Sequence, residues 1–224
     1  MSEDITSDSP NLNLLRHDKK SKFLFIDFES YNLCLHRDFN APWQAGLMMV
    51  QNNRVLDSKE ILFNWGGKFQ MKLGNPSFGH YSERTIQEKG MMPKEALNLI
   101  IDCFNNCDYV VGHNLMKFDI FILKELYALY RPASEDYRVW VDKIIDTKAL
   151  ALAIKLNVNK TLDESLQEFQ FRFLNYFKKG LKTNLTFLCK EYGIEVDETK
   201  LHSAVADLEY NLQIFNKQKY QLDI

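Results

Sequence analysis

The apolar run KFLFIDFE near the N-terminus restricts the fold more than any other part of the chain. Its aromatic and β-branched side chains are typical of a β-strand. At the two-residue period of a strand, Leu24, Ile26 and Phe28 share one face. Phe23 and Phe25 share the other face. Because both faces are apolar, we expect this strand at the centre of a sheet that is covered on both sides.

The remaining secondary structure follows from composition and periodicity. Further strands are expected at residues 45–51, 55–63, 108–113 and 139–145. Asn52-Asn53 between the first two favours a hairpin turn, and residues 64–90 are expected to be irregular. Helices are expected from Pro93, from about Lys117, from Asp146-Thr147, and over residues 162–169, 185–192 and 203–216. The helix from Lys117 is expected to bury Phe118, Phe121, Ile122, Leu126 and Leu129.

This order of elements predicts an α/β fold. An antiparallel start followed by alternating helices and strands implies a mixed five-stranded sheet flanked by helices. Residues 1–20 are rich in Ser, Asp and Asn and are expected to be a flexible leader. Residues 21–224 contain no repeat and no linker-like tract, so a single domain is expected there.

Composition limits the classes of function. The net charge of −2 argues against a general nucleic-acid coating protein, but it allows a nuclease that grips one strand end. Four cysteines lack metal-site spacing: Cys34, Cys103, Cys107 and Cys189. The N-terminus MSEDITSDSP has no signal-peptide core, and no apolar run approaches the ~20 residues of a membrane span. We therefore expect a soluble cytoplasmic protein with no membrane partner.

Two carboxylates stand at the end of the first strand. Asp27 and Glu29 are two residues apart, so they project from the same face of the strand. Two neighbouring acids repel each other unless a cation lies between them, and magnesium prefers carboxylate oxygens. The alternative is a pair of solvated acids just past the strand end. The pair alone does not decide between these interpretations.

Two later segments carry acids beside helix starts. GHNLMKFD, residues 112–119, places Asp119 in the first turn of a helix, where the macrodipole tolerates an anion. LHSAVAD, residues 201–207, places His202 at or just before the last helix and Asp207 within its second turn. Taken singly, each acid is also explained as an ordinary helix-end residue.

In order and spacing, these three segments resemble the motifs of the DEDDh exonucleases, the DnaQ-like family of the ribonuclease H-like superfamily. FIDFES matches the Asp-x-Glu motif at Asp27 and Glu29, and HNLMKFD matches the second motif at Asp119. His202 and Asp207 match the third motif, a histidine followed five residues later by an aspartate. The resemblance covers nearly all of the chain after the leader.

The resemblance implies a ribonuclease H-like sheet and a site for two divalent ions, Mg²⁺ or Mn²⁺. It implies that Asp27 bridges the two ions. Glu29 and Asp207 are implied to hold the ion that activates water, and Asp119 the second ion. His202 is implied as the general base, a role that suits a group titrating near neutrality.

Four further residues are expected to contact the terminal nucleotide: Phe28, Ser30, Asn114 and Phe118. The family usually has threonine at the position of Ser30, often followed by Thr-Gly. In this chain Tyr31 follows Ser30, and it is expected to narrow or reshape the nucleotide pocket.

Other conspicuous residues are given structural roles. Asp146 is expected to cap a helix, Asp142 to lie at the surface, and His113 to be structural. FRFLNYFKKGLK, residues 171–182, interleaves aromatic and basic residues, as single-strand-binding segments do. A helix with buried phenylalanines and solvated lysines explains the same pattern and is slightly favoured.

Together these residues predict a metal-dependent 3′→5′ exonuclease that releases nucleoside 5′-monophosphates from single-stranded DNA or RNA. One alternative is an RNA-trimming or oligoribonuclease-like exoribonuclease. A non-catalytic nucleic-acid-binding or proofreading-partner module is a weaker alternative, because all five site residues are present. A polymerase partner is weakly supported, since the chain ends soon after its last helix.

Overall fold

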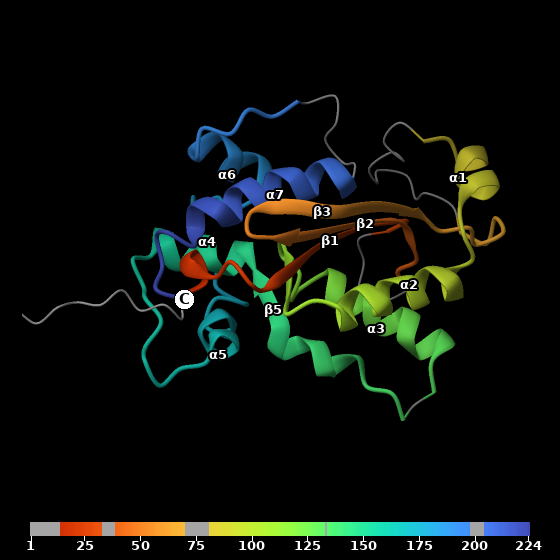
Figure 1. Ribbon diagram of the computed structural model, residues 1–224. Helices are drawn as coiled ribbons and strands as arrows, with labels where there is room; N and C mark the ends of the chain where they lie inside the picture. Colours follow the sequence, from red (N-terminus) through yellow and green to blue (C-terminus); the bar gives the residue numbers. More distant parts are fainter. Residues whose placement is uncertain (1–13, 33–38, 70–80, 133, 198–203) are drawn as a thin grey trace, which may run out of the picture.

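The computed structural model describes residues 14–32, 39–69, 81–132, 134–197 and 204–224, and these residues build one mixed sheet (Figure 1). The strands are β1 (Lys22–Ser30), β2 (Pro42–Gln51), β3 (Arg54–Leu62), β4 (Tyr109–Gly112) and β5 (Ile144–Asp146). Their order is β3-β2-β1-β4-β5. β1 pairs antiparallel with β2 and parallel with β4, and β5 pairs parallel with β4. The predicted mixed five-stranded sheet is therefore confirmed.

The hairpin between β2 and β3 turns at the predicted asparagines. Asn52 and Asn53 have φ values of 50° and 59°, in the left-handed region. Hairpin turns that match strand twist need positive φ at both central residues, and asparagine tolerates this conformation better than most residues. The Asn-Asn pair therefore fixes the register in which β2 and β3 pair.

Helices cover both faces of the sheet (Figure 1). They are α1 (Glu83–Lys89), α2 (Pro93–Asn105), α3 (Asp119–Tyr130), α4 (Thr147–Lys155), α5 (Leu166–Phe171), α6 (Leu185–Glu191) and α7 (Ala204–Gln218). Leu24, Ile26 and Phe28 belong to a core with residues of α2 and α3. Phe23 and Phe25 belong to a second core with residues of α4 and α7. β1 is thus covered on both sides, as its two apolar faces predict.

Several local predictions are wrong. Residues expected as a strand from 139 onward form a short 3₁₀ helix, η2 (Tyr137–Lys143), in which Val139 is 63% exposed, and only β5 is a strand. Phe121 and Leu129 lie on the exposed side of α3. Leu162 is fully exposed, because α5 begins only at Leu166. α1 lies in the stretch expected to be irregular.

The described part of the expected leader lies against the C-terminal end of the chain (Figure 1). It forms a 3₁₀ turn, η1 (Leu15–His17), in which Leu15 is buried. The Leu15 amide donates to the Ile224 carbonyl oxygen at 2.7 Å, and Arg16 pairs with Asp223.

No helix in the described part of the chain is long and apolar enough to cross a membrane.

Candidate active site

Three of the predicted carboxylates meet between β1 and α7. Asp27 and Glu29 project from the face of β1 that α7 covers, and Asp207 lies in the first turn of α7. One carboxylate oxygen of each residue lies within 4.8 Å of the others, and all three side chains are half-buried. Asp207 follows Glu29 by 178 positions in the sequence (207 minus 29), and the fold brings it into one cluster with the two acids of β1.

Two residues of β2 hold the start of α7 against β1. Gly46 is the partner of Asp27 in the β1–β2 register. A Cβ at Gly46 would lie 2.9 Å from the Ala204 carbonyl carbon, so only glycine leaves room for the helix here. The Gln44 side-chain oxygen also accepts a hydrogen bond from the Ala204 amide at 3.1 Å. These contacts place Asp207 beside Asp27.

Asp119 reaches the same end of β1 from the other side. It is the first residue of α3, and its side chain is 2% exposed. Its Oδ1 accepts a hydrogen bond from the Phe28 amide at 2.9 Å. Phe28 lies between Asp27 and Glu29 in the chain, so this bond fixes Asp119 next to the cluster. The four predicted metal ligands are therefore gathered at one end of the central strand.

Burial and mutual repulsion disfavour the charged forms of these acids. Burial, followed by the charge of Asp119, raises the pKa of Asp27 well above its ordinary value. Burial and the charge of Asp207 raise the pKa of Glu29 to about 8. Burial raises the pKa of Asp119 to about 7, although the hydrogen bond from Phe28 opposes that shift. A concentration of carboxylates that repel one another fits a site for divalent cations, whose charge would offset the repulsion.

Asp146 is a structural acid, as predicted. It is the N-cap of α4, and its side chain accepts the amides of Lys148 and Ala149. The same carboxylate accepts the amides of Asn114 and Met116, each at 3.0 Å. It therefore ties the segment before Asp119 to the start of α4. Four backbone donors leave this buried carboxylate little capacity for another ligand.

His113 and Asn114 are held by neighbouring side chains of α4. His113 Nδ1 lies 3.0 Å from the Thr147 hydroxyl oxygen, and burial lowers the pKa of His113 to about 4. Asn114 has a φ of 66°, and its Oδ1 accepts a hydrogen bond from Lys148 Nζ at 3.0 Å. Sequence reasoning missed Lys148, although it stands two residues after the Asp146 cap.

Phe28 and Ser30, which were expected to contact the nucleotide, are both buried. Phe28 is 4% exposed and packs against Phe63, on the face of β1 opposite to Asp27. The Ser30 hydroxyl is buried and donates to the Asn32 carbonyl oxygen at 2.6 Å. Tyr31, expected to reshape the pocket, is also buried.

Two expected site residues remain. Phe118 is half-buried against the core beside α3 and immediately precedes Asp119. His202, the predicted general base, lies outside the described residues. Its role stays a prediction of the sequence.

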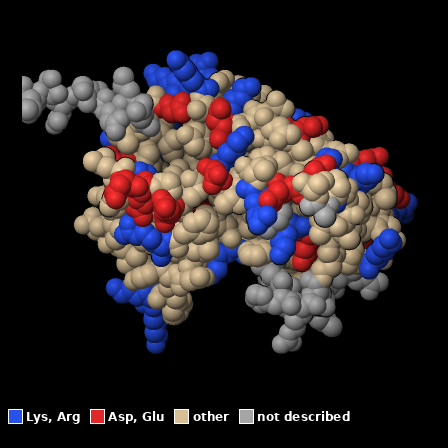
Figure 2. Space-filling view, turned by 90° about the horizontal axis from the view of Figure 1, so that it is seen from below, with Lys and Arg blue, Asp and Glu red and all other residues tan. Residues whose placement is uncertain are grey.

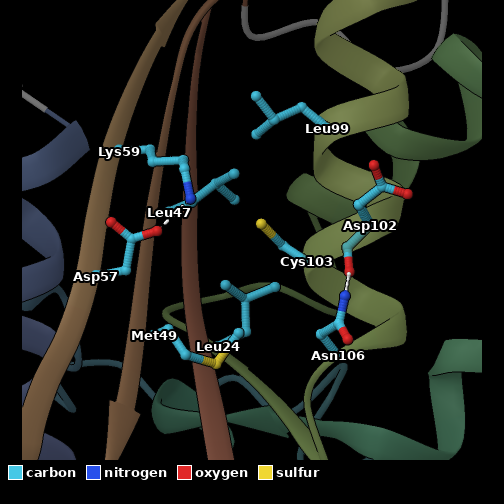
Figure 3. Close-up of a pocket in the computed structure, with 9 residues that line it drawn as sticks. All are labelled: Leu24, Leu47, Met49, Asp57, Lys59, Leu99, Asp102, Cys103 and Asn106. Carbon is cyan, nitrogen blue, oxygen red and sulfur yellow. Dashed lines mark hydrogen bonds and ion pairs between the residues drawn. The ribbon is translucent and has the colours of Figure 1, made fainter.

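A separate cavity of about 380 Å³ lies on the opposite face of the sheet (Figure 3). Its floor includes Leu24, which shares the Phe28 face of β1 and not the Asp27 face. Asp57 and Lys59 of β3 form an ion pair at its rim, and Cys103 of α2 points into it (Figure 3). None of the four clustered carboxylates lines this cavity.

Comparisons with known proteins identify the fold. No family model matches the chain, and no curated protein matches it by sequence. Among solved structures, E. coli exonuclease I in complex with a dA16 oligonucleotide superposes with a TM-score of 0.66 at 17% identity, covering 88% of this chain and 40% of that one. The zinc-bound E. coli exonuclease I–ssDNA complex gives a TM-score of 0.59 at 16% identity, with coverages of 88% and 40%.

A third structure, the complex named ExoI/SSB-Ct, gives a TM-score of 0.57 at 16% identity and covers 90% of this chain and 41% of that chain. This chain thus spans about two fifths of the exonuclease I chains that it matches, and at these identities the likeness concerns the fold. The chain therefore has the ribonuclease H-like α/β fold found in the E. coli exonuclease I structures.

Proposed function

We propose that this protein is a metal-dependent 3′→5′ exonuclease that hydrolyses the terminal phosphodiester bond of a single-stranded nucleic acid. The observation that carries the proposal is the cluster of Asp27, Glu29 and Asp207, whose oxygens lie within 4.8 Å of one another. Asp119 stands beside it through its bond to the Phe28 amide. The fold, shared with E. coli exonuclease I, supports the assignment.

The carboxylates divide into two groups around the end of β1. Asp27, Glu29 and Asp207 would together hold one Mg²⁺ or Mn²⁺ ion, and Asp27 with Asp119 would hold a second. Two divalent cations in such a site stabilise the charge on the attacking and leaving oxygens of an in-line displacement. The structural neighbours include a zinc-bound form of exonuclease I, which supports a metal site on this fold.

The protein's own groups would orient the strand end and move the proton. Asn114, held in place by Lys148, lies in the segment that leads to Asp119 and would contact the terminal nucleotide. His202 precedes α7 by two residues in the sequence and would accept the proton of the attacking water. Hydrolysis would leave a nucleoside 5′-monophosphate and a strand shortened by one residue. Complexes of exonuclease I with dA16 and ssDNA favour DNA as the substrate.

Oligonucleotides labelled at either end test this proposal. DNA and RNA, single- and double-stranded, are incubated with the protein and Mg²⁺ or Mn²⁺. We expect 5′-labelled single strands to shorten stepwise, and 3′-labelled strands to release labelled mononucleotide at once. A 3′-terminal phosphate should slow the reaction strongly, and circular single strands should survive. Rapid cutting of circles would contradict an exonuclease, and turnover of RNA alone would favour the exoribonuclease alternative.

A further inference from the structure

The end of α5 and the segment that follows it expose aromatic rings beside lysines. Phe171, Tyr176 and Phe177 are 49%, 41% and 88% exposed. Lys178 and Lys179 follow directly and are exposed, and neither forms an ion pair with a described residue. The expectation of a helix that buries its phenylalanines is therefore wrong for Phe171 and Phe177. We call these five residues the aromatic–basic surface.

Buried neighbours hold this segment in place. Phe173 is 4% exposed and packs edge-on against Phe169, with ring centroids 5.4 Å apart. The Arg172 guanidinium lies 5.7 Å from the centroids of both rings and pairs with Glu164 at 3.1 Å. The chain thus buries Phe169 and Phe173 as anchors and leaves Phe171 and Phe177 exposed to water. Several exposed rings close together in one anchored segment make this surface a candidate binding site.

The aromatic–basic surface adjoins the candidate active site. Tyr176 lines a pocket of about 50 Å³ together with Asn114, Lys117 and Lys148. Lys117 precedes Asp119 by two residues, so the pocket lies between the N-terminal end of α3 and the exposed ring of Tyr176. Lys117 and Lys148 both line this pocket. They would meet the phosphates of a strand that leads away from the carboxylates.

We propose that the aromatic–basic surface binds an unpaired nucleic-acid strand whose 3′ end lies at the carboxylates. The position of that 3′ end rests on the proposed exonuclease function, whereas the binding itself does not. Bases stack on exposed rings only when they are free of a partner strand, and lysines beside the rings neutralise phosphates. On the face in Figure 2, acidic and basic side chains are interspersed, and the net charge is −2. Local lysines, and not a general basic field, would therefore attract the strand.

Binding without metal tests the surface independently of turnover. The anisotropy of fluorescent oligothymidylate and oligouridylate of about twelve nucleotides is measured in EDTA. Phe177→Ala should weaken binding by about 5- to 150-fold, the range of one lost stacking contact. Lys178→Ala with Lys179→Ala should lower the slope of log affinity against log salt by about 1.4, since each phosphate contact to a single strand contributes about 0.7. A blunt duplex and a dinucleotide should bind wild type and Phe177→Ala equally.

Matched controls are available outside this surface. Tyr220 is 62% exposed beyond α7, and Lys94 is exposed on α2, on the opposite face of the sheet. Tyr220→Ala and Lys94→Ala should leave oligonucleotide binding unchanged. If Phe177→Ala binds single strands as tightly as wild type, or if Tyr220→Ala weakens binding equally, the surface is not a strand-binding site and a protein partner becomes the better occupant.

Kinetics separate this proposal from the exonuclease assignment. With an oligonucleotide substrate, Phe177→Ala should raise KM and leave kcat within about twofold, because a stacking contact outside the reacting bond is equally strong in the ground state and the transition state. Loss of metal-free binding in Phe177→Ala, together with no hydrolysis by wild type, would support the surface and overturn the exonuclease. Hydrolysis by wild type with an unchanged KM in Phe177→Ala would overturn the surface alone.

Discussion

Gly46 faces Ala204 so closely that an added methyl group would lie 2.9 Å from the Ala204 carbonyl carbon and 3.0 Å from its oxygen. Gly46 is also the strand partner of Asp27. The absence of a side chain on β2 therefore sets how near α7 comes to β1. That approach places Asp207 within reach of Asp27 and Glu29.

Gly46→Ala should push α7 away from the sheet. The nearest atoms belong to the backbone, which has no flexible end to yield, so we expect a loss of about 1–3 kcal/mol in the free energy of unfolding. Displacement of Asp207 should lower hydrolysis by about 10²-fold and weaken Mn²⁺ binding. Calorimetric titration with Mn²⁺ and urea unfolding measure the two effects. A folded Gly46→Ala protein with wild-type metal affinity and turnover would show that the site does not need the close contact between α7 and β2.

Asp27→Asn and Asp207→Asn should each abolish turnover in Mg²⁺. Each change removes a ligand oxygen and one charge from a crowded cluster, so the metal-free variants should melt at a higher temperature than wild type. Asp142→Asn changes an exposed acid outside the cluster and serves as the matched control. Hydrolysis assays with thermal melting in EDTA check both expectations. Near-wild-type hydrolysis by Asp27→Asn would rule out the proposed site.

The raised carboxylate pKa values predict that the metal-free protein becomes less stable as the pH rises. Burial and Asp207 raise the pKa of Glu29 from 4.5 to about 8, and burial raises the pKa of Asp119 from 3.8 to about 7. A folded state with raised pKa values binds more protons than the unfolded state, so the resulting stability is present at low pH. It is lost as the pH rises through the folded-state values. Melting in EDTA should therefore shift to lower temperature between about pH 5 and pH 8.

Glu29→Gln should flatten this pH dependence and stabilise the metal-free protein near pH 8. In the wild-type protein, saturating Mg²⁺ should recover the stability that is lost near pH 8, because the ion binds the folded protein with its carboxylates deprotonated. Glu209→Gln changes an exposed acid on α7 and should leave the slope as in wild type. A metal-free wild-type protein whose melting temperature rises steadily from pH 5 to pH 8 would contradict the raised pKa values.

The sequence predicted the elements that depend on local pattern. Alternating apolar residues in β1, the Asn52-Asn53 turn and the Asp146 cap each act within a few residues, and the structure confirms all three. The role of Gly46 depends on the register between two strands and on a helix 158 residues later, since 204 minus 46 is 158. No local pattern carries that information.

The exposed faces were harder to predict than the buried ones. Phe121 and Leu129 fit the apolar stripe of α3 by spacing, yet both are exposed, because the core contacts Ile122 and Leu126 on a narrower face. Phe177 was interpreted as part of a helix, but the helix ends at Phe171. Periodicity alone does not show how wide the buried face of a helix is, and singly exposed apolar residues are common on protein surfaces.

His202→Ala tests the predicted general base. Base catalysis by a positioned side chain contributes about 10²–10⁴-fold, so kcat should fall by that order. The carboxylates of β1, α3 and α7 would hold the metal without His202, so Mn²⁺ affinity and oligonucleotide binding should stay near wild type. His17, an exposed histidine of η1, provides the matched control, and His17→Ala should be fully active.

The pH–rate profile distinguishes base catalysis from a structural role of His202. Only neutral imidazole accepts a proton, so the wild-type rate should rise with pH through the histidine pKa. In His202→Ala this limb should vanish or move toward the ionisation of metal-bound water. A structural defect would instead lower the rate by the same factor at every pH. If His202→Ala keeps both the wild-type kcat and the acidic limb, another group accepts the proton. Only the metal-binding role of the carboxylate cluster would then be left from the proposed mechanism.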